Sequence, residues 1–254
     1  MRKIILTVFA SSLVLSLFQP VNAAVCQATS GAQRVSLLEL YTSEGCSSCP
    51  PADKWLSNLK PDATHVIPLA FHVDYWDYIG WKDQFSKAEF SVRQRKTAAL
   101  AGAGFVYTPQ FILNGHDYKT GSEALGSASA DGKKSTAPAA LNLSIINQNN
   151  GALLLKTNAL LTDAVDSKYA EVFVAIYENK LVSQVKAGEN NGRELKHDYV
   201  VRQLFGAYPV SNKTFSKDFI LNPSWKSRPA GVVMFVQNSK TGEILQSLQL
   251  PLCS

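Results

Sequence analysis

The 254-residue sequence has only two methionines, Met1 and Met234, no internal repeat and no glycine-rich phosphate-binding loop. The lack of a methionine cluster weighs against a copper carrier. The formal net charge is +5, or +3 without Arg2 and Lys3, and it is too small and too evenly spread to indicate nucleic-acid binding. Beyond the amino-terminal apolar run no segment is long enough to span a membrane, so we expect no stable membrane insertion.

The amino terminus has the layout of a secretory signal peptide. Arg2 and Lys3 precede an apolar run over 4–18, and Ala23 is a small residue at a suitable cleavage position. We therefore expect 1–23 to be removed and the mature protein to be periplasmic or secreted. Two alternatives are an uncleaved anchor, for which the run is short, and lipidation at Cys26, whose preceding residues do not fit a lipidation signal.

Four cysteines remain in the mature chain and allow three pairings. An exported protein meets an oxidising environment in which disulfides persist. Cys46 and Cys49 are close enough to pair with each other, which leaves Cys26 and Cys253 and predicts a structural disulfide between them. That bridge requires the two chain ends to meet; otherwise one or both of these cysteines are free or pair between chains.

Cys46 and Cys49 lie where a β-prone run over 35–41 is expected to lead into a helix that starts with prolines, which the first helical turn tolerates. A disulfide across so short a loop constrains the unfolded chain little, so the pair suits chemistry better than stabilisation. A helix N-terminus stabilises a thiolate. We expect Cys46 to be the more exposed, attacking thiol and Cys49 the resolving thiol.

The residues after a second predicted strand, 65–71, are expected to lie near Cys46. The two strands flank a helix, so they should be parallel, with their carboxyl ends at one edge of the sheet. His72 is then an acid–base group, a metal ligand or a hydrogen-bonded anchor of its loop. Trp76 belongs to the aromatic segment 72–83, which either faces substrate or packs on the body of the domain.

Two further patterns complete the first half of the chain. Residues 86–100 read as a helix capped by Ser86. Thr108-Pro109 is expected at the start of a strand, since proline interrupts a strand ladder, and Asn114-Gly115 predicts a hairpin turn.

A dithiol at a strand–helix junction followed by Thr-Pro at the start of a hairpin resembles the thioredoxin superfamily. The resemblance implies a cis Pro109 against the redox sulfurs, with Thr108 and Pro109 binding the backbone of an extended substrate. The phrases Ser-Glu-Gly-Cys-Ser-Ser-Cys-Pro-Pro-Ala-Asp, Phe-His-Val-Asp-Tyr-Trp-Asp and Tyr-Thr-Pro-Gln more narrowly resemble an exported bacterial family of thioredoxin-like proteins catalogued as domain of unknown function 1223. The sequence departs from thioredoxin at Gly45 and in the Ser-Ser between the cysteines, so the redox potential is open.

The second half of the chain has a different pattern. Residues 127–139 are rich in small and polar residues and read as a linker. Alternating apolar positions from 140 onward predict several short antiparallel strands. The expected architecture is an α/β thioredoxin-like domain over 24–126, with a central mixed sheet flanked by helices, and a β-sandwich-like domain over 140–254.

The segment 188–202 is polar and glycine-rich before an apolar strand. Either it returns to the redox face, with Arg193, His197 or Arg202 touching substrate, or it is an ordered loop between domains in which His197 and Asp198 form a bridging pair. We favour the second interpretation.

These patterns favour an exported thiol–disulfide oxidoreductase that acts on protein or peptide thiols and disulfides without a metal or organic cofactor. In that hypothesis Cys46 and Cys49 are catalytic, and Thr108, Pro109, His72 and Trp76 bind substrate. One alternative is a Cu(I) or other metal-binding module that uses Cys46, Cys49 and His72. Another is a noncatalytic binding protein with a permanent disulfide. The cysteine spacing gives no support for a four-cysteine zinc site.

Overall fold

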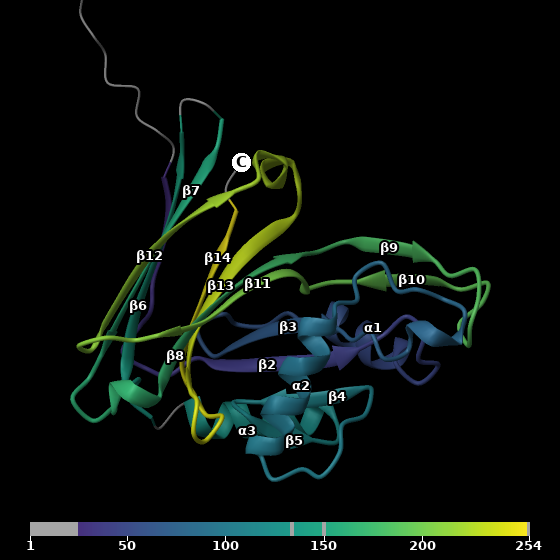
Figure 1. The fold of residues 1–254 in the computed structure, drawn as a ribbon, viewed down its shortest axis with the longest axis horizontal. Coiled ribbons are helices and arrows are strands. Elements are labelled where there is room, and N and C mark those ends of the chain that lie inside the picture. Colours follow the sequence, from purple (N-terminus) through teal and green to yellow (C-terminus); the bar gives the residue numbers. More distant parts are fainter. Residues whose placement is uncertain (1–24, 133–134, 149–150, 253–254) are drawn as a thin grey trace, which may run out of the picture.

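The computed structural model describes residues 25–132, 135–148 and 151–252. These ranges form fourteen β-strands, three α-helices and three short 3-10 helices, most of them arranged around two large sheets (Figure 1). The larger sheet is mixed and has the order β14-β13-β8-β11-β3-β2-β4-β5. Its strands are Ile244–Pro251 (β14), Ala230–Asn238 (β13), Ala170–Glu178 (β8), Val200–Pro209 (β11), Val66–His72 (β3), Ser36–Thr42 (β2), Gln110–Leu113 (β4) and His116–Tyr118 (β5).

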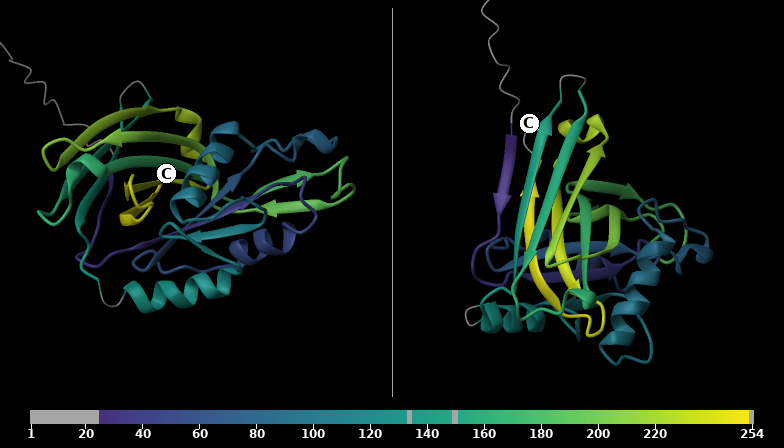
Figure 2. Two further views of the ribbon diagram at one scale, coloured as in Figure 1. Left: turned by 60° about the horizontal axis from the view of Figure 1, so that its bottom comes forward. Right: turned by 60° about the vertical axis from the view of Figure 1, so that its left-hand side comes forward.

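The second sheet is antiparallel and packs face to face on part of the first (Figure 2). Its order is β1-β6-β7-β12, formed by Val25–Thr29 (β1), Ala139–Asn147 (β6), Leu153–Leu161 (β7) and Thr214–Leu221 (β12). Buried residues alternate with more exposed ones along β6 and β7, as expected for strands with one covered face. Leu143 and Leu155 from this sheet share an apolar core with Ile176 and Met234 from the larger one.

The central strands β2 and β3 are buried along their whole length. They run parallel to each other and are covered on both faces, which explains their continuous apolar runs. One face packs against α1 (Pro50–Asn58) and α3 (Gly121–Gly132), and the other against α2 (Ala88–Leu100).

The predicted fold class is wrong. We expected a helix-flanked thioredoxin-like α/β domain followed by a separate β-sandwich-like domain, but the described chain is mostly β-structure. Strands β8, β11, β13 and β14 from the second half of the sequence continue the sheet that holds β2 and β3. β11 joins β3 in parallel at Val200 and Ala70.

The error has a physical reason. Periodicity indicates that a segment is a strand and which face is apolar, but backbone pairing groups are alike in all strands. The open edge of β3 was therefore free to accept a strand from anywhere in the chain.

Two helices have other bounds than the sequence predicted, and one predicted hairpin is present. Helix α2 begins at Ala88, not Ser86, and the Ser86 hydroxyl donates to Asp77 instead, at 2.8 Å. Helix α3 runs to Gly132, inside the segment expected to be a linker. The predicted hairpin is present: Asn114 and Gly115, both with positive φ, join β4 to β5. Within the described ranges, no helix is long and apolar enough to cross a bilayer.

Candidate functional site

The sheet topology brings two other segments to the loop that follows β2 and carries Cys46. β2 and β3 are parallel with Thr42 opposite His72, so both strands end at the same edge. β4 runs antiparallel to β2 with Gln110 opposite Tyr41, which places the Thr108–Pro109 peptide at this edge as well. The loop after β2 leads directly into α1.

Cys46 and Cys49 form a disulfide with their Cα atoms 5.4 Å apart. Cys49 is the N-cap residue of α1. Both cysteines are 0% exposed, so the expectation that Cys46 is the more exposed of the two is wrong. Ser47 and Ser48 between them are exposed, so solvent reaches this loop but not its sulfurs.

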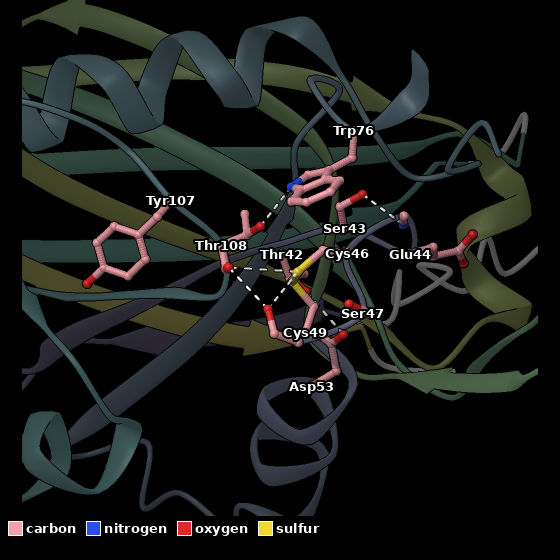
Figure 3. Close-up of a disulfide and its surroundings, with 12 residues drawn as sticks. Thr42, Ser43, Glu44, Cys46, Ser47, Cys49, Asp53, Trp76, Tyr107 and Thr108 are labelled. Atoms are coloured by element: carbon pink, nitrogen blue, oxygen red, sulfur yellow. Dashed lines mark hydrogen bonds between the residues drawn. A yellow bond between two sulfur atoms is a disulfide. The ribbon is translucent and has the colours of Figure 1, made fainter. Parts of the chain in front are cut away.

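The sulfur of Cys46 faces the segment before β4. Its Sγ lies 3.7 Å from the carbonyl oxygen of Thr108 and 3.3 Å from the Ser48 hydroxyl. The Thr108–Pro109 peptide is cis, and proline has no N–H to donate to a sulfur. The indole N–H of Trp76 donates to the Thr108 hydroxyl at 2.8 Å, so these two side chains meet beside Cys46 (Figure 3).

Gly45 allows the cysteine loop to approach Trp76 closely. A Cβ at this position would lie 3.0 Å from the Trp76 Cβ and 3.3 Å from the Trp76 carbonyl oxygen. A side chain at position 45 would therefore crowd Trp76, which comes from the loop after β3.

A cluster of five titratable side chains is buried around the ends of β2 and β3. The residues are Glu44, Asp53, His72, Asp83 and His197, each between 0% and 6% exposed. His72 Nδ1 lies 2.6 Å from Asp83 Oδ2, and the Thr42 hydroxyl donates to Asp53 at 3.1 Å. Several polar atoms of the cluster have no hydrogen-bond partner, among them Glu44 Oε1, His72 Nε2 and both ring nitrogens of His197.

His197 lies between two carboxylates of this cluster. Its Nε2 lies 3.4 Å from Glu44 Oε1 and its Nδ1 lies 3.9 Å from Asp53 Oδ2. Its ring meets that of His72 edge to face, with centroids 4.9 Å apart. Glu44 also accepts from the Trp81 indole at 2.7 Å, and its side chain points away from the sulfurs (Figure 3).

Burial and pairing shift the pKa values in this cluster in different directions. Burial opposes a charge on His72, but the neighbouring Asp83 overrides it and leaves the pKa of His72 raised. Burial likewise opposes ionisation of Asp83, yet His72 and the amides of Glu44 and Phe85 hold its pKa below the ordinary value. Burial raises the pKa of Asp53, against partial opposition from His197 and His72. The cluster is largely buried, and Asp53 and His197 also line a pocket between α1 and β10 (Glu194–His197).

A hairpin from the second half of the chain closes over the cysteine loop. It consists of β9 (Leu181–Gln184) and β10 (Glu194–His197). At its tip, Asn190 donates through Nδ2 to the carbonyl oxygens of Glu44 and Cys46, at 2.8 and 2.9 Å. Glu189 Oε2 accepts from the backbone amide of Ser47 at 3.0 Å. The segment singled out in the sequence does return to the cysteine loop.

Of the three residues named from the sequence, His197 does reach this region, beside Glu44, and the other two do not. Arg193 is exposed, and Arg202 donates to Glu178 at 2.7 Å. Sequence reasoning missed Glu189 and Asn190, although Gly188 and Gly192, both with positive φ, bracket them and mark a loop of defined shape.

The remaining predicted site residues are placed as follows. Cys26 lies in β1 within the apolar core, and its expected partner Cys253 lies outside the described residues. β1 and β14 contact each other, so the first and last strands lie side by side (Figure 2). Among the side chains that the structure describes, no three histidine, cysteine, aspartate or glutamate residues are grouped as metal ligands.

Comparison with known proteins gives the family and the fold but no activity. No curated protein matches the sequence. Protein AGR_C_4864 from Agrobacterium tumefaciens, a solved structure, aligns with a TM-score of 0.60 and 24% identity, covering 87% of this chain and 96% of that one. HBP35 of Porphyromonas gingivalis aligns with a TM-score of 0.64 and 16% identity, covering 87% of this chain and 76% of that one. At these identities the likeness concerns the fold alone.

The profile of one sequence family matches residues 37–237, which is most of the chain. This range includes both cysteines of the disulfide, the Thr108–Pro109 peptide and the β9–β10 hairpin. The chain therefore belongs to the family described as protein of unknown function (DUF1223).

Proposed function

We propose that this protein is an exported thiol–disulfide oxidoreductase in which Cys46 and Cys49 are the redox pair. The observation that carries the proposal is the position of the Cys46–Cys49 disulfide at the N-terminus of α1, with the Cys46 sulfur against the Thr108 carbonyl. A helix N-terminus favours a thiolate. The resemblance to the thioredoxin superfamily that supports this proposal is limited to the thiol pair and the facing proline.

The reaction proceeds through two exchange steps. The Cys46 thiolate attacks one sulfur of a substrate disulfide, forms a mixed disulfide and releases the other substrate sulfur as a thiolate. The Cys49 thiolate then attacks the Cys46 sulfur, which releases the second substrate thiolate and re-forms the Cys46–Cys49 disulfide. The reverse sequence oxidises a substrate dithiol. No metal or organic cofactor takes part.

Two features next to the Cys46–Cys49 pair bear on this chemistry. Asp53 is buried in the first turn of α1, where its amide donates to the Cys49 carbonyl at 3.1 Å and its carboxyl group accepts from the Thr42 hydroxyl at 3.1 Å. Trp76 and Thr108 meet beside Cys46. Substrate reaches the buried sulfur when these two side chains part, and the Thr108–Pro109 backbone then lies beside the substrate chain.

The test is a redox titration of the mature protein against a glutathione couple, with Cys49→Ala and Cys46→Ala as a matched pair of variants. We expect the wild-type pair to titrate within the range of the glutathione couple. Reduced Cys49→Ala should accumulate a mixed disulfide at Cys46, detected by mass spectrometry, and Cys46→Ala should accumulate far less. A pair that stays oxidised below about −300 mV would instead indicate a permanent disulfide.

A further inference from the structure

The N-terminus of α1 favours a thiolate through its dipole, but its first turn has few free backbone amides that could donate to the Cys46 sulfur. Pro50 and Pro51 have no N–H. The amide of Cys49 donates to the Cys46 carbonyl at 3.2 Å. The Ser48 hydroxyl lies 3.3 Å from the Cys46 sulfur, and the amide of Ser47, the residue after Cys46, donates to Glu189.

Glu189 brings a negative charge to the same place. It is exposed, and hydrogen bonds from the side chain and the amide of Ser47 lower its pKa, so it is ionised at neutral pH. A carboxylate close to a thiol disfavours the thiolate. Glu189 thus acts on Cys46 in two ways, since it occupies an amide donor and adds a like charge.

Asn190 fixes the position of Glu189. Its side chain is 0% exposed, and its amide nitrogen bridges the carbonyl oxygens of Glu44 and Cys46. The residue next to Glu189 is therefore anchored on both sides of Gly45. Gly188, on the other side, has a positive φ of 71° that a side chain would strain, and a Cβ there would lie 3.4 Å from Ile79 and from Trp81.

We propose that the tip of the β9–β10 hairpin is a clasp on the cysteine loop: Asn190 docks it, and Glu189 lowers the reactivity of Cys46 by competing for the Ser47 amide and by its charge. This inference rests on the proposed function, because it concerns the thiolate which that function requires. Glu189 and Asn190 are positioning residues. When the tip lifts, the Ser47 amide becomes available to the Cys46 sulfur.

Other charged groups surround the loop and are common to every variant compared below. The buried groups are Glu44, Asp53, His72, Asp83 and His197, and exposed ones on the adjoining helix and hairpin are Lys54, Lys186, Arg193, Glu194 and Lys196. A difference in Cys46 alkylation between the parent protein and a Glu189 variant is therefore due to Glu189.

The experiment measures alkylation of Cys46 by iodoacetamide as a function of pH in the reduced Cys49→Ala protein, with the Cys46 peptide quantified by mass spectrometry. Iodoacetamide is neutral, so its approach is not steered by charge. Glu189→Gln should shift the midpoint to lower pH and raise the rate below the midpoint roughly threefold to tenfold. Glu189→Ala should have at least as large an effect, because it also frees the amide. Asn190→Ala should shift the profile in the same direction.

Asn191→Ala is the matched control, since Asn191 is the neighbouring exposed asparagine, and it should leave the profile unchanged. The clasp is disproved if both Glu189 variants alkylate like the parent protein, or if Asn191→Ala changes the rate as much as they do. Failure of the proposed function is a separate result: the Glu189 variants shift the profile, yet Cys46 forms no mixed disulfide with glutathione.

Discussion

The two ends of the eight-stranded sheet are built on different principles. Where β8, β13 and β14 face the second sheet, the shared core is apolar, with residues such as Leu155, Val174 and Met234. At the carboxyl ends of β2 and β3, five titratable side chains are buried together, and several of their polar atoms lack a partner. Buried polar atoms without partners cost stability, so one end of the sheet stabilises the fold while the other holds the candidate site.

The largest expected effect on the site end of the sheet comes from removing one member of the buried pair His72–Asp83. Asp83 binds His72 and also accepts from the amides of Glu44 and Phe85 at 2.9 Å each. Breaking a buried pair by removing one partner costs about 3–5 kcal/mol. We expect Asp83→Asn to lower the free energy of unfolding by about 4 kcal/mol in urea titrations of the oxidised protein. A loss as small as that of a surface substitution would contradict the role given to the pair.

The same variant predicts a pH dependence. The pKa of His72 is raised from 6.5, so its contribution is fully present below that value and is lost as pH rises through the folded-state pKa. The pKa of Asp83 is lowered from 3.8, so its contribution is present above that value and is lost as pH falls through the folded-state pKa. The stability difference between wild type and Asp83→Asn should therefore be largest between these two ordinary values and smaller on either side.

The apolar half is tested by Leu155→Ala. Leu155 is 0% exposed and belongs to the core between the two sheets. Truncating a buried leucine leaves a cavity and costs about 3 kcal/mol. The same variant should leave the glutathione titration midpoint of Cys46 and Cys49 unchanged, which Asp83→Asn need not do. If Leu155→Ala moves that midpoint, the two halves are coupled and the comparison fails.

Local features of the site could be predicted because they depend on neighbours in sequence. The strand–helix junction that carries Cys46 and Cys49, the start of β4 after Pro109 and the turn at Asn114 and Gly115 each follow from proline, glycine and short apolar runs. The parallel pairing of β2 and β3 follows from the intervening helix.

Features that depend on distant pairing could not be predicted. Nothing in the sequence states that β11 adds to β3, and the separate second domain was expected for that reason. The same pairing carries the β9–β10 hairpin to the cysteine loop, so Glu189 and Asn190 were missed together with the fold. Trp76 and Thr108 were both expected near Cys46, but the burial of its sulfur was missed because the sequence pattern does not show that these two side chains bond to each other beside it.

The smallest expected effect on stability concerns the hydrogen bond from Trp76 to Thr108. Trp76→Phe keeps an aromatic ring and removes the donor, which should cost about 1 kcal/mol, because the bond is only partly buried. The rate at which dithiothreitol reduces the disulfide should rise by about fivefold, as expected when a closed state loses roughly that free energy. Reduction is followed by quenching and mass spectrometry.

Thr108→Val removes the acceptor of the same bond and provides the matched comparison. If the bond closes the site, each single variant should speed reduction by a similar factor, and the double variant should be no faster than either. Additive effects, or a rate change in Trp76→Phe alone, would show that the indole limits access by its bulk. If the double variant is no faster than either single variant, a hydrogen bond of modest strength controls the rate of disulfide reduction at the candidate site. In the apolar half, by contrast, Leu155→Ala changes stability and leaves the redox midpoint of Cys46 and Cys49 unchanged.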